Sequence, residues 1–559
     1  MSLVLFVVVT MAFTGLALGL RARPRLATGI ALIGLVTAIV VAVAIVPGQL
    51  TVVGGGALAT SAYLRLFLIF GSVIGFALAV SGLAGGSRRD APTVTLGILA
   101  SVGLTLGLLD PRAAVLVATA GGLFGVLVTL VPNGGRAGAT IGIRESRAVA
   151  VAGALAIAAT AWFGRDLSGL TAQPVVFGLA YLGFAVAVAL RFGAIPFHLW
   201  AARLADVVPE TALPNLTAYA PASLALVALA WIDLSVAPIA QDLGPDRLVV
   251  IAIAVASIVL AAVAAFVQDD IEHILGYSII GDAGVVILAL AAIGPDTWGP
   301  TRTWILAFVI ARSAFAAWVA GVRAGFWTGR VADLRGWALR SPLLTVAFGL
   351  VVVASVGFPG LAAFDARTEI VQGALTGPLT PVVLVATLAP IAYYGRLLVI
   401  GFLRPDRVLE PVDAWRPVVK PLDLTAVRPW LSTTWDANRA FSTGAIALVL
   451  AVMALATAGG AFGGPAAAAE GPPVLASPHP LGAPSASSAP VAPGAPATSG
   501  APPSETAVPQ PSAEPSGTSS TNPSADPTET PFVAPSATPA GPTASGSIAT
   551  PTPVPSVGQ

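Results

Sequence analysis

The sequence predicts an all-α polytopic membrane protein, and two observations support that prediction. Of its 559 residues, 56% are hydrophobic and only 10% are charged, which is a composition that water-soluble domains do not have. The hydrophobic residues gather in runs of roughly 20, which is the length an α-helix needs to cross a bilayer. We therefore expect about 14 transmembrane helices, followed by a disordered C-terminal tail.

The expected helices follow one another along most of the chain. They cover residues 1–20, 27–47, 63–85, 93–109, 113–131, 148–164, 174–198, 214–232, 248–267, 274–293, 302–322, 341–373, 379–402 and 443–462. The seventh and the twelfth are long, and proline interrupts both. The seventh lies in a block formed by helices four to eight, and the twelfth lies in a block formed by helices nine to thirteen. Broken helices at corresponding positions are typical of transporters with inverted repeats, so we expect two inverted five-helix repeats with broken helices 7 and 12.

Basic residues indicate how the chain is oriented. If the N-terminus lies outside, nineteen basic residues fall in inner loops and four in outer loops. Cytoplasmic loops of membrane proteins carry such an excess of Lys and Arg. We therefore expect a multi-pass protein of the cell (plasma) membrane with both termini extracytoplasmic.

Composition also divides the chain into three parts. Residues 1–92 hold three N-terminal transmembrane helices, and residues 93–462 hold the core and the C-terminal helices. Residues 463–559 are rich in Pro, Ala, Ser and Thr and contain neither Lys nor Arg. Such a segment cannot bury enough apolar surface to offset its chain entropy, so we expect it to be a disordered extracytoplasmic tail.

The residue inventory limits the chemistry of the chain. It has no cysteine, only three histidines and a net charge of +1. The absence of cysteine excludes disulfides, thiolate metal sites and cysteine-ligated iron–sulfur clusters. The net charge gives no indication of nucleic-acid binding. We therefore expect no cofactor, no bound metal and no redox centre in this chain, and a lipid bilayer as its surroundings.

Charged residues inside the predicted spans are the first candidates for a functional site. A charge at the centre of a bilayer costs about 2.5–3.5 kcal/mol on insertion scales and indicates a functional site by default. Arg191 lies five residues before Pro196 in the seventh span. Arg312 lies in the middle of the eleventh span, and Asp282 in the tenth is its best available counter-charge. Each such pair can instead be a structural ion pair that fixes helix packing.

The broken helices carry further candidates. Arg367 follows Gly357–Gly360, which should break the twelfth span, and Asp365 and Glu369 flank it. His198 lies at the inner end of the seventh span and is either a hydrogen-bonded structural residue or a proton shuttle. We therefore expect an ion pathway that includes these four residues together with Arg191, Asp282 and Arg312.

Three segments resemble a known family. Arg191–Trp200 is similar to the family's Lys-x4-Pro-Phe-His-x-Trp-x-Pro-Asp segment. Asp270–Ile279 is similar to Asp-Leu-Lys-Arg-Leu-Leu-Ala-Tyr-Ser-Ser, and Gly357–Ile370 to Gly-Ile-Pro-Pro-x-x-Gly-Phe-x-x-Lys. Over about residues 60–460 the chain thus resembles the antiporter-like membrane subunits of respiratory complex I (subunits L, M and N). Related subunits occur in Mrp-type Na⁺/H⁺ antiporters and in membrane hydrogenases.

The resemblance implies proton movement along an axis of buried charges, coupled to quinone reduction in partner subunits. Arg191, Arg312 and Arg367 fall on the lysines that the family has in its seventh, eleventh and twelfth helices. Two positions depart from the family, because Gly121-Gly122 stands where its fifth helix has Glu and Ser223 where its eighth has Lys. Arginine stays protonated where a buried lysine can release its proton. These departures imply a pump that is weakened or retuned.

The sequence leaves four alternative functions open. The first is a proton-conducting membrane-arm subunit of a complex I-like NADH-quinone oxidoreductase without a redox centre of its own. The second is a degenerate, non-pumping paralogue in such a complex, and the third is a subunit of an Mrp-type antiporter. The fourth is a membrane anchor for the C-terminal tail. The first three imply other membrane subunits as partners and contact with quinone only through them.

Overall fold

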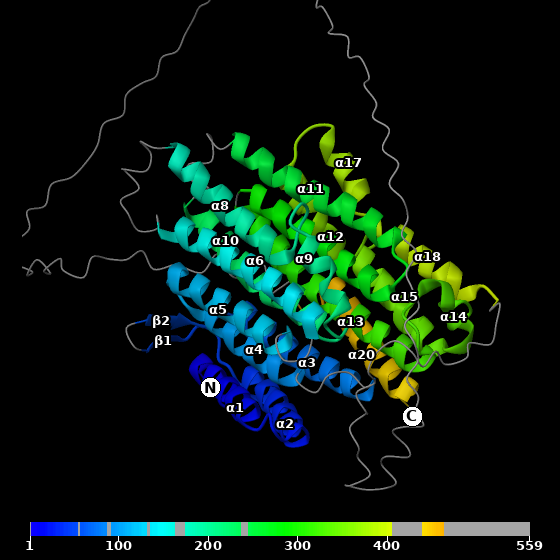
Figure 1. Ribbon diagram of the computed structural model, residues 1–559. Helices are drawn as coiled ribbons and strands as arrows, with labels where there is room; N and C mark the ends of the chain where they lie inside the picture. The colour runs from blue at the N-terminus through cyan, green and yellow to red at the C-terminus, as the bar shows by residue number, and fades with distance from the viewer. Residues whose placement is uncertain are drawn as a thin grey trace, which may run out of the picture. The chain divides into compact units, whose positions relative to one another are not determined.

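The computed structural model describes eight segments of the chain and is mostly helical in them (Figure 1). The described residues are 2–53, 56–85, 91–130, 135–161, 174–235, 244–293, 295–404 and 439–462. The predicted C-terminal tail at 463–559 lies outside them. Among them, nine helices are long and apolar enough to cross a membrane, and four shorter apolar helices accompany these nine. The chain is a multi-pass membrane protein.

Every span expected from the sequence overlaps one or two helices. Before the first break these are α1 (Leu3–Gly19), α2 (Pro24–Val43), α3 (Ala62–Ala84), α4 (Ala91–Gly107), α5 (Pro111–Leu130), α6 (Gly135–Ala161) and α8 (Pro174–Phe192). After it come α9 (Leu199–Ala202), α10 (Ala220–Ser235), α11 (Gly244–Val267), α12 (Ile271–Ala291), α13 (Trp298–Phe326), α14 (Trp337–Arg340), α15 (Pro342–Val356), α16 (Ala362–Ala374), α17 (Leu379–Ala386), α18 (Pro390–Phe402) and α20 (Arg439–Ala458). One π-helical turn, Asn215–Tyr219, precedes α10.

Short polar caps fix where several helices begin. Ser61 accepts a hydrogen bond from the backbone N–H of Leu64 at 2.9 Å at the start of α3. Asp270 accepts one from Glu272 N–H at 2.9 Å at the start of α12. Such caps satisfy backbone donors that the first turn of a helix leaves unpaired. The starts of these helices are therefore encoded in their own sequence.

The prediction of an all-α fold is wrong in one place. Strands β1 (Leu50–Val53) and β2 (Gly56–Ala59) form an antiparallel hairpin between α2 and α3, with Leu50 opposite Ala59. Thr51, Val52 and Val53 are β-branched, which favours extended backbone. These two strands lie between the expected spans 27–47 and 63–85.

The predicted start of the sixth span at residue 148 is also wrong, because α6 begins at Gly135. The prediction counted only apolar residues and so assigned 144–147 to a loop. In the structure Arg144 and Arg147 are exposed on this helix while Glu145 between them is fully buried. A helix continues through polar residues wherever one of its faces is exposed.

Both predicted helix breaks are confirmed. Helix α8 ends at Phe192, Gly193 takes φ +64°, and a cis Ile195–Pro196 peptide leads to α9. Helix α15 ends at Val356, and Gly357 and Gly360, with φ of +61° and +95°, lead to α16. Side chains with a Cβ rarely adopt these backbone angles, so glycine permits both turns. A third break, between α17 and α18, was not predicted.

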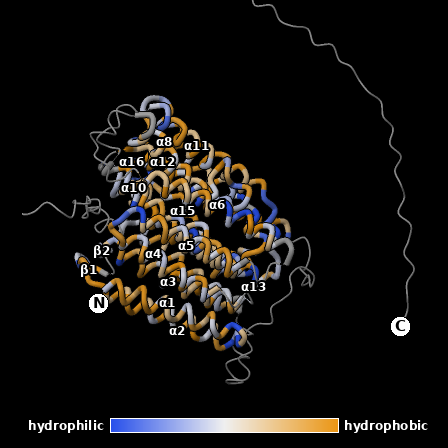
Figure 2. Tube along the Cα trace, turned by 60° about the vertical axis from the view of Figure 1, so that its left-hand side comes forward, coloured by the Kyte–Doolittle hydropathy of each residue, from blue (hydrophilic) through white to orange (hydrophobic). Residues whose placement is uncertain are grey.

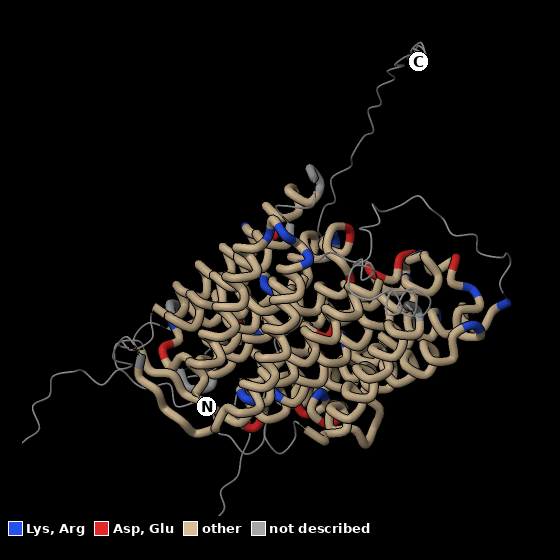
Figure 3. Tube along the Cα trace, turned by 90° about the horizontal axis from the view of Figure 1, so that it is seen from below, with Lys and Arg blue, Asp and Glu red and all other residues tan. Residues whose placement is uncertain are grey.

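Helix α13 is surrounded by other helices and is almost entirely buried. It packs against α3, α12, α15, α16 and α20. On the other side, α6 packs between α5 and α8, and α8 packs against α11 and α12. Hydrophobic residues run along the helices in Figure 2, and in Figure 3 most charged residues lie toward helix ends with a few among the packed helices. The buried charged residues carry the candidate site.

Candidate functional site

Three arginines predicted inside the membrane are buried. Their exposed fractions are 4% for Arg191, 0% for Arg312 and 2% for Arg367. A buried charge requires a partner charge or several hydrogen bonds. Each arginine meets that requirement in a different way, so we describe the three surroundings one by one.

Arg312 on α13 forms a tight ion pair with Asp282 on α12, as the sequence predicts. Its Nε donates to Asp282 Oδ2 at 2.6 Å, and its Nη2 lies 2.6 Å from the same oxygen. Its Nη1 donates to the hydroxyl of Tyr394 on α18. The charge-assisted hydrogen bond from Nε and the ion-pair contact of Nη2 fix both side chains. The result is a positive charge held by three helices.

Arg367 on α16 binds backbone carbonyls instead of a carboxylate. Its Nη1 donates to Val356 O at 2.7 Å and to Thr387 O at 3.4 Å, and its Nη2 donates to Gly357 O at 3.3 Å. These carbonyls belong to the break between α15 and α16 and to the break between α17 and α18. Helix ends leave such carbonyls without helical partners. Arg367 therefore stabilises both breaks at once.

A small cavity lies between the Arg312 and Arg367 surroundings. Its lining includes Ser278 and Asp282 of α12, Trp304 of α13, Arg367 and Tyr393. In the described part of the chain, the buried hydroxyl of Tyr393 and the Nε of Arg367 have no hydrogen-bond partner. A cavity lined by polar groups favours water over an empty space. The carboxylate, the two arginines and the cavity form what we call the second site.

Arg191 at the end of α8 lies in different surroundings, which we call the first site. Its guanidinium packs on Gly122 of α5, where a methyl group would lie 2.3 Å from Nη2 and 3.0 Å from Val149 Cγ1 of α6. Glu145, one helical turn before Val149, is fully buried, and it and Arg191 attract one another electrostatically. Glycine at 122 thus provides the room that the arginine occupies. The nearby acid comes from α6, where the sequence analysis did not look for it.

The remaining predicted site residues do not join these two sites as charge partners. His198 precedes α9 and is half-buried, with its ring centroid 6.4 Å from that of Tyr277. Its buried Nδ1 has no hydrogen-bond partner among the described residues. Asp365 and Glu369 are exposed on α16, whereas Arg367 between them is buried. Their carboxylates therefore do not neutralise Arg367.

A further charged cluster was missed by the sequence analysis. Arg323, near the C-terminal end of α13, forms ion pairs with Glu272 in the first turn of α12 and with Glu210, the latter at 3.3 Å. His273 Nε2 lies 3.1 Å from Asp206 Oδ1. All five residues lie near the start of α12 or the C-terminal end of α13, or in the segment after α9. They connect the segment after the seventh helix to the start of α12.

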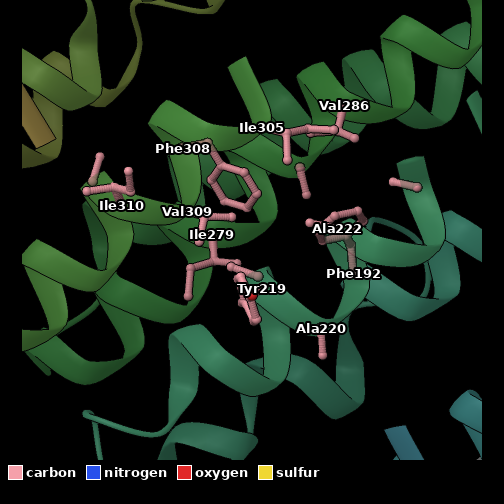
Figure 4. Close-up of a cluster of buried hydrophobic side chains, with 14 of the residues drawn as sticks. Phe192, Tyr219, Ala220, Ala222, Ile279, Val286, Ile305, Phe308, Val309 and Ile310 are labelled. Atoms are coloured by element: carbon pink, nitrogen blue, oxygen red, sulfur yellow. The ribbon is translucent and has the colours of Figure 1, made fainter. Parts of the chain in front are cut away.

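Hydrophobic side chains lie between α8 and α13, as Figure 4 shows. Phe192, the neighbour of Arg191, packs against Phe308 with ring centroids 6.1 Å apart. Phe308 lies one helical turn before Arg312. Tyr219, Ile279 and Ile305 complete this cluster. Apolar side chains therefore pack beside the residue next to Arg191 and beside the turn before Arg312.

Residues 157–391 match the family described as NADH:quinone oxidoreductase/Mrp antiporter, transmembrane. The chain resembles this family of antiporter-like membrane subunits over that segment. It is similar to NADH-quinone oxidoreductase subunit N of Halorhodospira halophila, with 30% identity over 44% of this chain and 51% of that protein. Subunit N of Rhodococcus opacus is also 30% identical, over 44% of this chain and 46% of that protein. The chain thus spans about half the length of the curated relatives it matches.

Solved structures show that the likeness of fold extends further. The fold is similar to a chain of the Mrp complex of Dietzia sp., with a TM-score of 0.70 and 19% identity over 85% of this chain and 98% of that chain. A chain of respiratory complex I from Thermus thermophilus gives a TM-score of 0.60 at 19% identity, over 81% of this chain and 97% of that one. At these identities the likeness concerns the fold alone. The family match contains Arg191, Asp282, Arg312 and Arg367, and it begins after Glu145 and ends before Tyr393.

Proposed function

We propose that this antiporter-like subunit conducts protons across the membrane as part of a complex I-like NADH-quinone oxidoreductase. Proton movement is coupled to quinone reduction, which takes place in partner subunits. The observation that carries the proposal is the second site. There a buried carboxylate and the buried guanidinium of Arg367 line a cavity beside two helix breaks, and the buried guanidinium of Arg312 pairs with that carboxylate. Ionisable residues buried in a membrane protein mark ion pathways and proton relays.

The residues of the second site have different roles in proton transfer, which follow from their chemistry. The guanidinium groups of Arg312 and Arg367 stay protonated, so they act as fixed positive charges. Asp282 is the group at this site that can take up and release a proton. Ser278 and Tyr393 carry hydroxyls that can donate to and accept from water in the cavity. Proton transfer then runs through the carboxylate and water, while the two arginines supply a constant positive electrostatic potential.

The finer architecture belongs to the same proposal. Residues 1–92 supply three N-terminal helices, and residues 93–462 supply the proton-conducting core within a total of 14 membrane crossings. The breaks after α8 and after α15 are the equivalent points of two inverted five-helix repeats. Both termini lie outside the cytoplasm of a cell whose plasma membrane holds the complex. Partners are the other membrane subunits, and quinone is met only through them.

Reconstitution of the assembled complex tests the proposal. We expect the wild-type complex in sealed vesicles to move protons during NADH-driven quinone reduction, and Asp282→Asn to lower the number of protons moved per NADH. The control Asp365→Asn, on the exposed face of α16, should leave that number unchanged. Unchanged proton movement in Asp282→Asn, with the variant assembled, identifies a non-pumping paralogue. Sodium-coupled proton movement without NADH oxidation identifies an Mrp-type subunit instead.

A further inference from the structure

The first site contains a buried acid that the proposed function does not use. Glu145 on α6 has an exposed fraction of 0%. Neither of its carboxylate oxygens has a hydrogen-bond partner within the described part of the chain. A buried charged group without hydrogen bonds is expensive, so such a group is retained for a reason other than stability.

The position of Glu145 follows from the face of α6 that carries it. Ile141, Glu145, Val149, Ala152 and Ala156 are buried, with the spacing of one helical face. Val149 lies beside the point where Arg191 packs on Gly122. Glu145 is one turn away from Val149 on the same face. The carboxylate and the guanidinium therefore belong to one buried region between α5, α6 and α8.

The charged and titratable groups around Glu145 are few. On α8 the charge is Arg191, and on α5 it is Arg112, which donates to the carbonyls of Thr160 and Ala161 at the opposite end of α6. Helix α9 also packs against α6, and His198 precedes it. On α6 itself, Arg144 and Arg147 are exposed.

Unpaired polar atoms gather around the broken seventh helix. Besides the oxygens of Glu145, the buried Nδ1 of His198 and the buried Nε1 of Trp200 lack hydrogen-bond partners among the described residues. His198 precedes α9 and Trp200 lies in it, and α9 contacts α6. Buried polar atoms of this kind are commonly satisfied by water. The helix break thus brings a carboxylate, an imidazole and an indole N–H to neighbouring elements.

We infer that Glu145 is the proton-binding group of the first site and that Arg191 is its positioning partner. Glu145 can exist with or without a proton, while the arginine stays charged. Proton binding to Glu145 changes the net charge of the Glu145–Arg191 pair from zero to plus one. The missing hydrogen bond between them leaves the carboxylate free to exchange its proton with water. This inference rests on the proposed function and adds to it an acid on α6.

The test uses the assembled complex in its reconstituted form with Glu145→Gln, which keeps the size of the side chain and removes the proton site. We expect fewer protons moved per NADH, normal assembly, and loss of one carboxylic-acid band from the redox-induced infrared difference spectrum. Glu145→Asp should restore part of both signals. Arg147→Gln, two residues further on the exposed side of the same helix, is the matched control and should change neither.

The outcomes separate this inference from the proposed function. If Asp282→Asn lowers the proton number but Glu145→Gln leaves the number and the infrared band intact, the inference is overturned and the proposed function stands. If neither substitution lowers the proton number, the proposed function fails. In that case loss of the band in Glu145→Gln still supports proton binding at Glu145, and an unchanged band overturns it.

Discussion

The first and the second site hold a buried arginine beside a broken helix, but they hold it in opposite ways. Arg312 is fixed by two contacts to Asp282 and by a third to Tyr394. Arg191 lies against Gly122, and its acid, Glu145, makes no hydrogen bond in the described part of the chain. The arrangement at the second site is rigid, and the arrangement at the first site is loose. A rigid pair contributes more to the stability of the fold, and a loosely held acid exchanges its proton more easily.

The difference teaches how arginine can occupy positions where proton transfer needs a group that ionises. A guanidinium cannot give up its proton under physiological conditions. A site that contains arginine therefore needs a separate acid, and the freedom of that acid decides what the site can do. At the second site a hydrogen bond and an ion-pair contact from Arg312 hold the acid, whereas at the first site none of the described residues donates to it. We therefore assign the second site the larger structural role and the first site the easier proton exchange.

The largest effect should come from removing the acid of the second site. Asp282→Ala leaves Arg312 buried without its counter-charge, which typically costs about 3–5 kcal/mol. We expect a strong fall in the midpoint of thermal unfolding of the purified protein in detergent. Asp365→Ala, an exposed acid, should leave the midpoint in place. Equal midpoints for the two variants would mean that the Asp282–Arg312 pair does not hold α12 and α13 together.

Tyr394→Phe should have a smaller effect at the same site. It removes the hydroxyl that accepts from Arg312 Nη1, and hydrogen bonds to charged groups contribute about 1.5–3 kcal/mol. The unfolding midpoint should fall less than in Asp282→Ala. Combining the two substitutions should cost less than their sum, because both act on one arginine. Additive effects would show that Tyr394 stabilises α18 independently of Arg312.

The sequence predicted the second site better than the first, for a physical reason. Helices α12 and α13 follow one another in the chain, so a charge on one predicts a partner on the other. Glu145 was missed because it stands between Arg144 and Arg147, and a short charged run resembles a loop. Helical spacing offered the missing indication, since Ile141, Glu145 and Val149 fall on one face.

Another feature could not be predicted from side chains at all. The hydrogen-bond partners of Arg367 are backbone carbonyls. Every residue carries such a carbonyl, so no residue type indicates which ones the arginine binds. The break between α17 and α18 was missed, although Pro390 in the first turn of α18 indicates it. By contrast, the breaks after α8 and α15 were predicted, because glycine and proline state their backbone preferences directly.

Gly122→Ala is the corresponding test at the first site. The added methyl would lie 2.3 Å from Arg191 Nη2, so the guanidinium must move, and overpacking of this kind costs about 1–3 kcal/mol. We expect a modest fall in the unfolding midpoint and a larger loss of proton movement. Gly183→Ala on α8 is the matched control, since the nearest atom to its new methyl is 4.0 Å away. Normal proton movement in Gly122→Ala would show that the position of Arg191 is not critical.

The smallest effects should come from Asp365→Asn and Glu369→Gln. Both side chains are exposed on α16, and exposed substitutions usually change stability by no more than about 0.5 kcal/mol. In the purified chain we therefore expect unchanged unfolding midpoints, although both acids flank Arg367 in sequence. The assembled complex adds a second measurement, namely the fraction of the chain that co-purifies with its partner subunits. If that fraction falls while the midpoint of the isolated chain stays constant, the exposed face of α16 binds a partner. A fall in the midpoint itself would mean that one of these acids does neutralise Arg367, and the contrast between a buried arginine held by carbonyls and one held by a carboxylate would no longer hold.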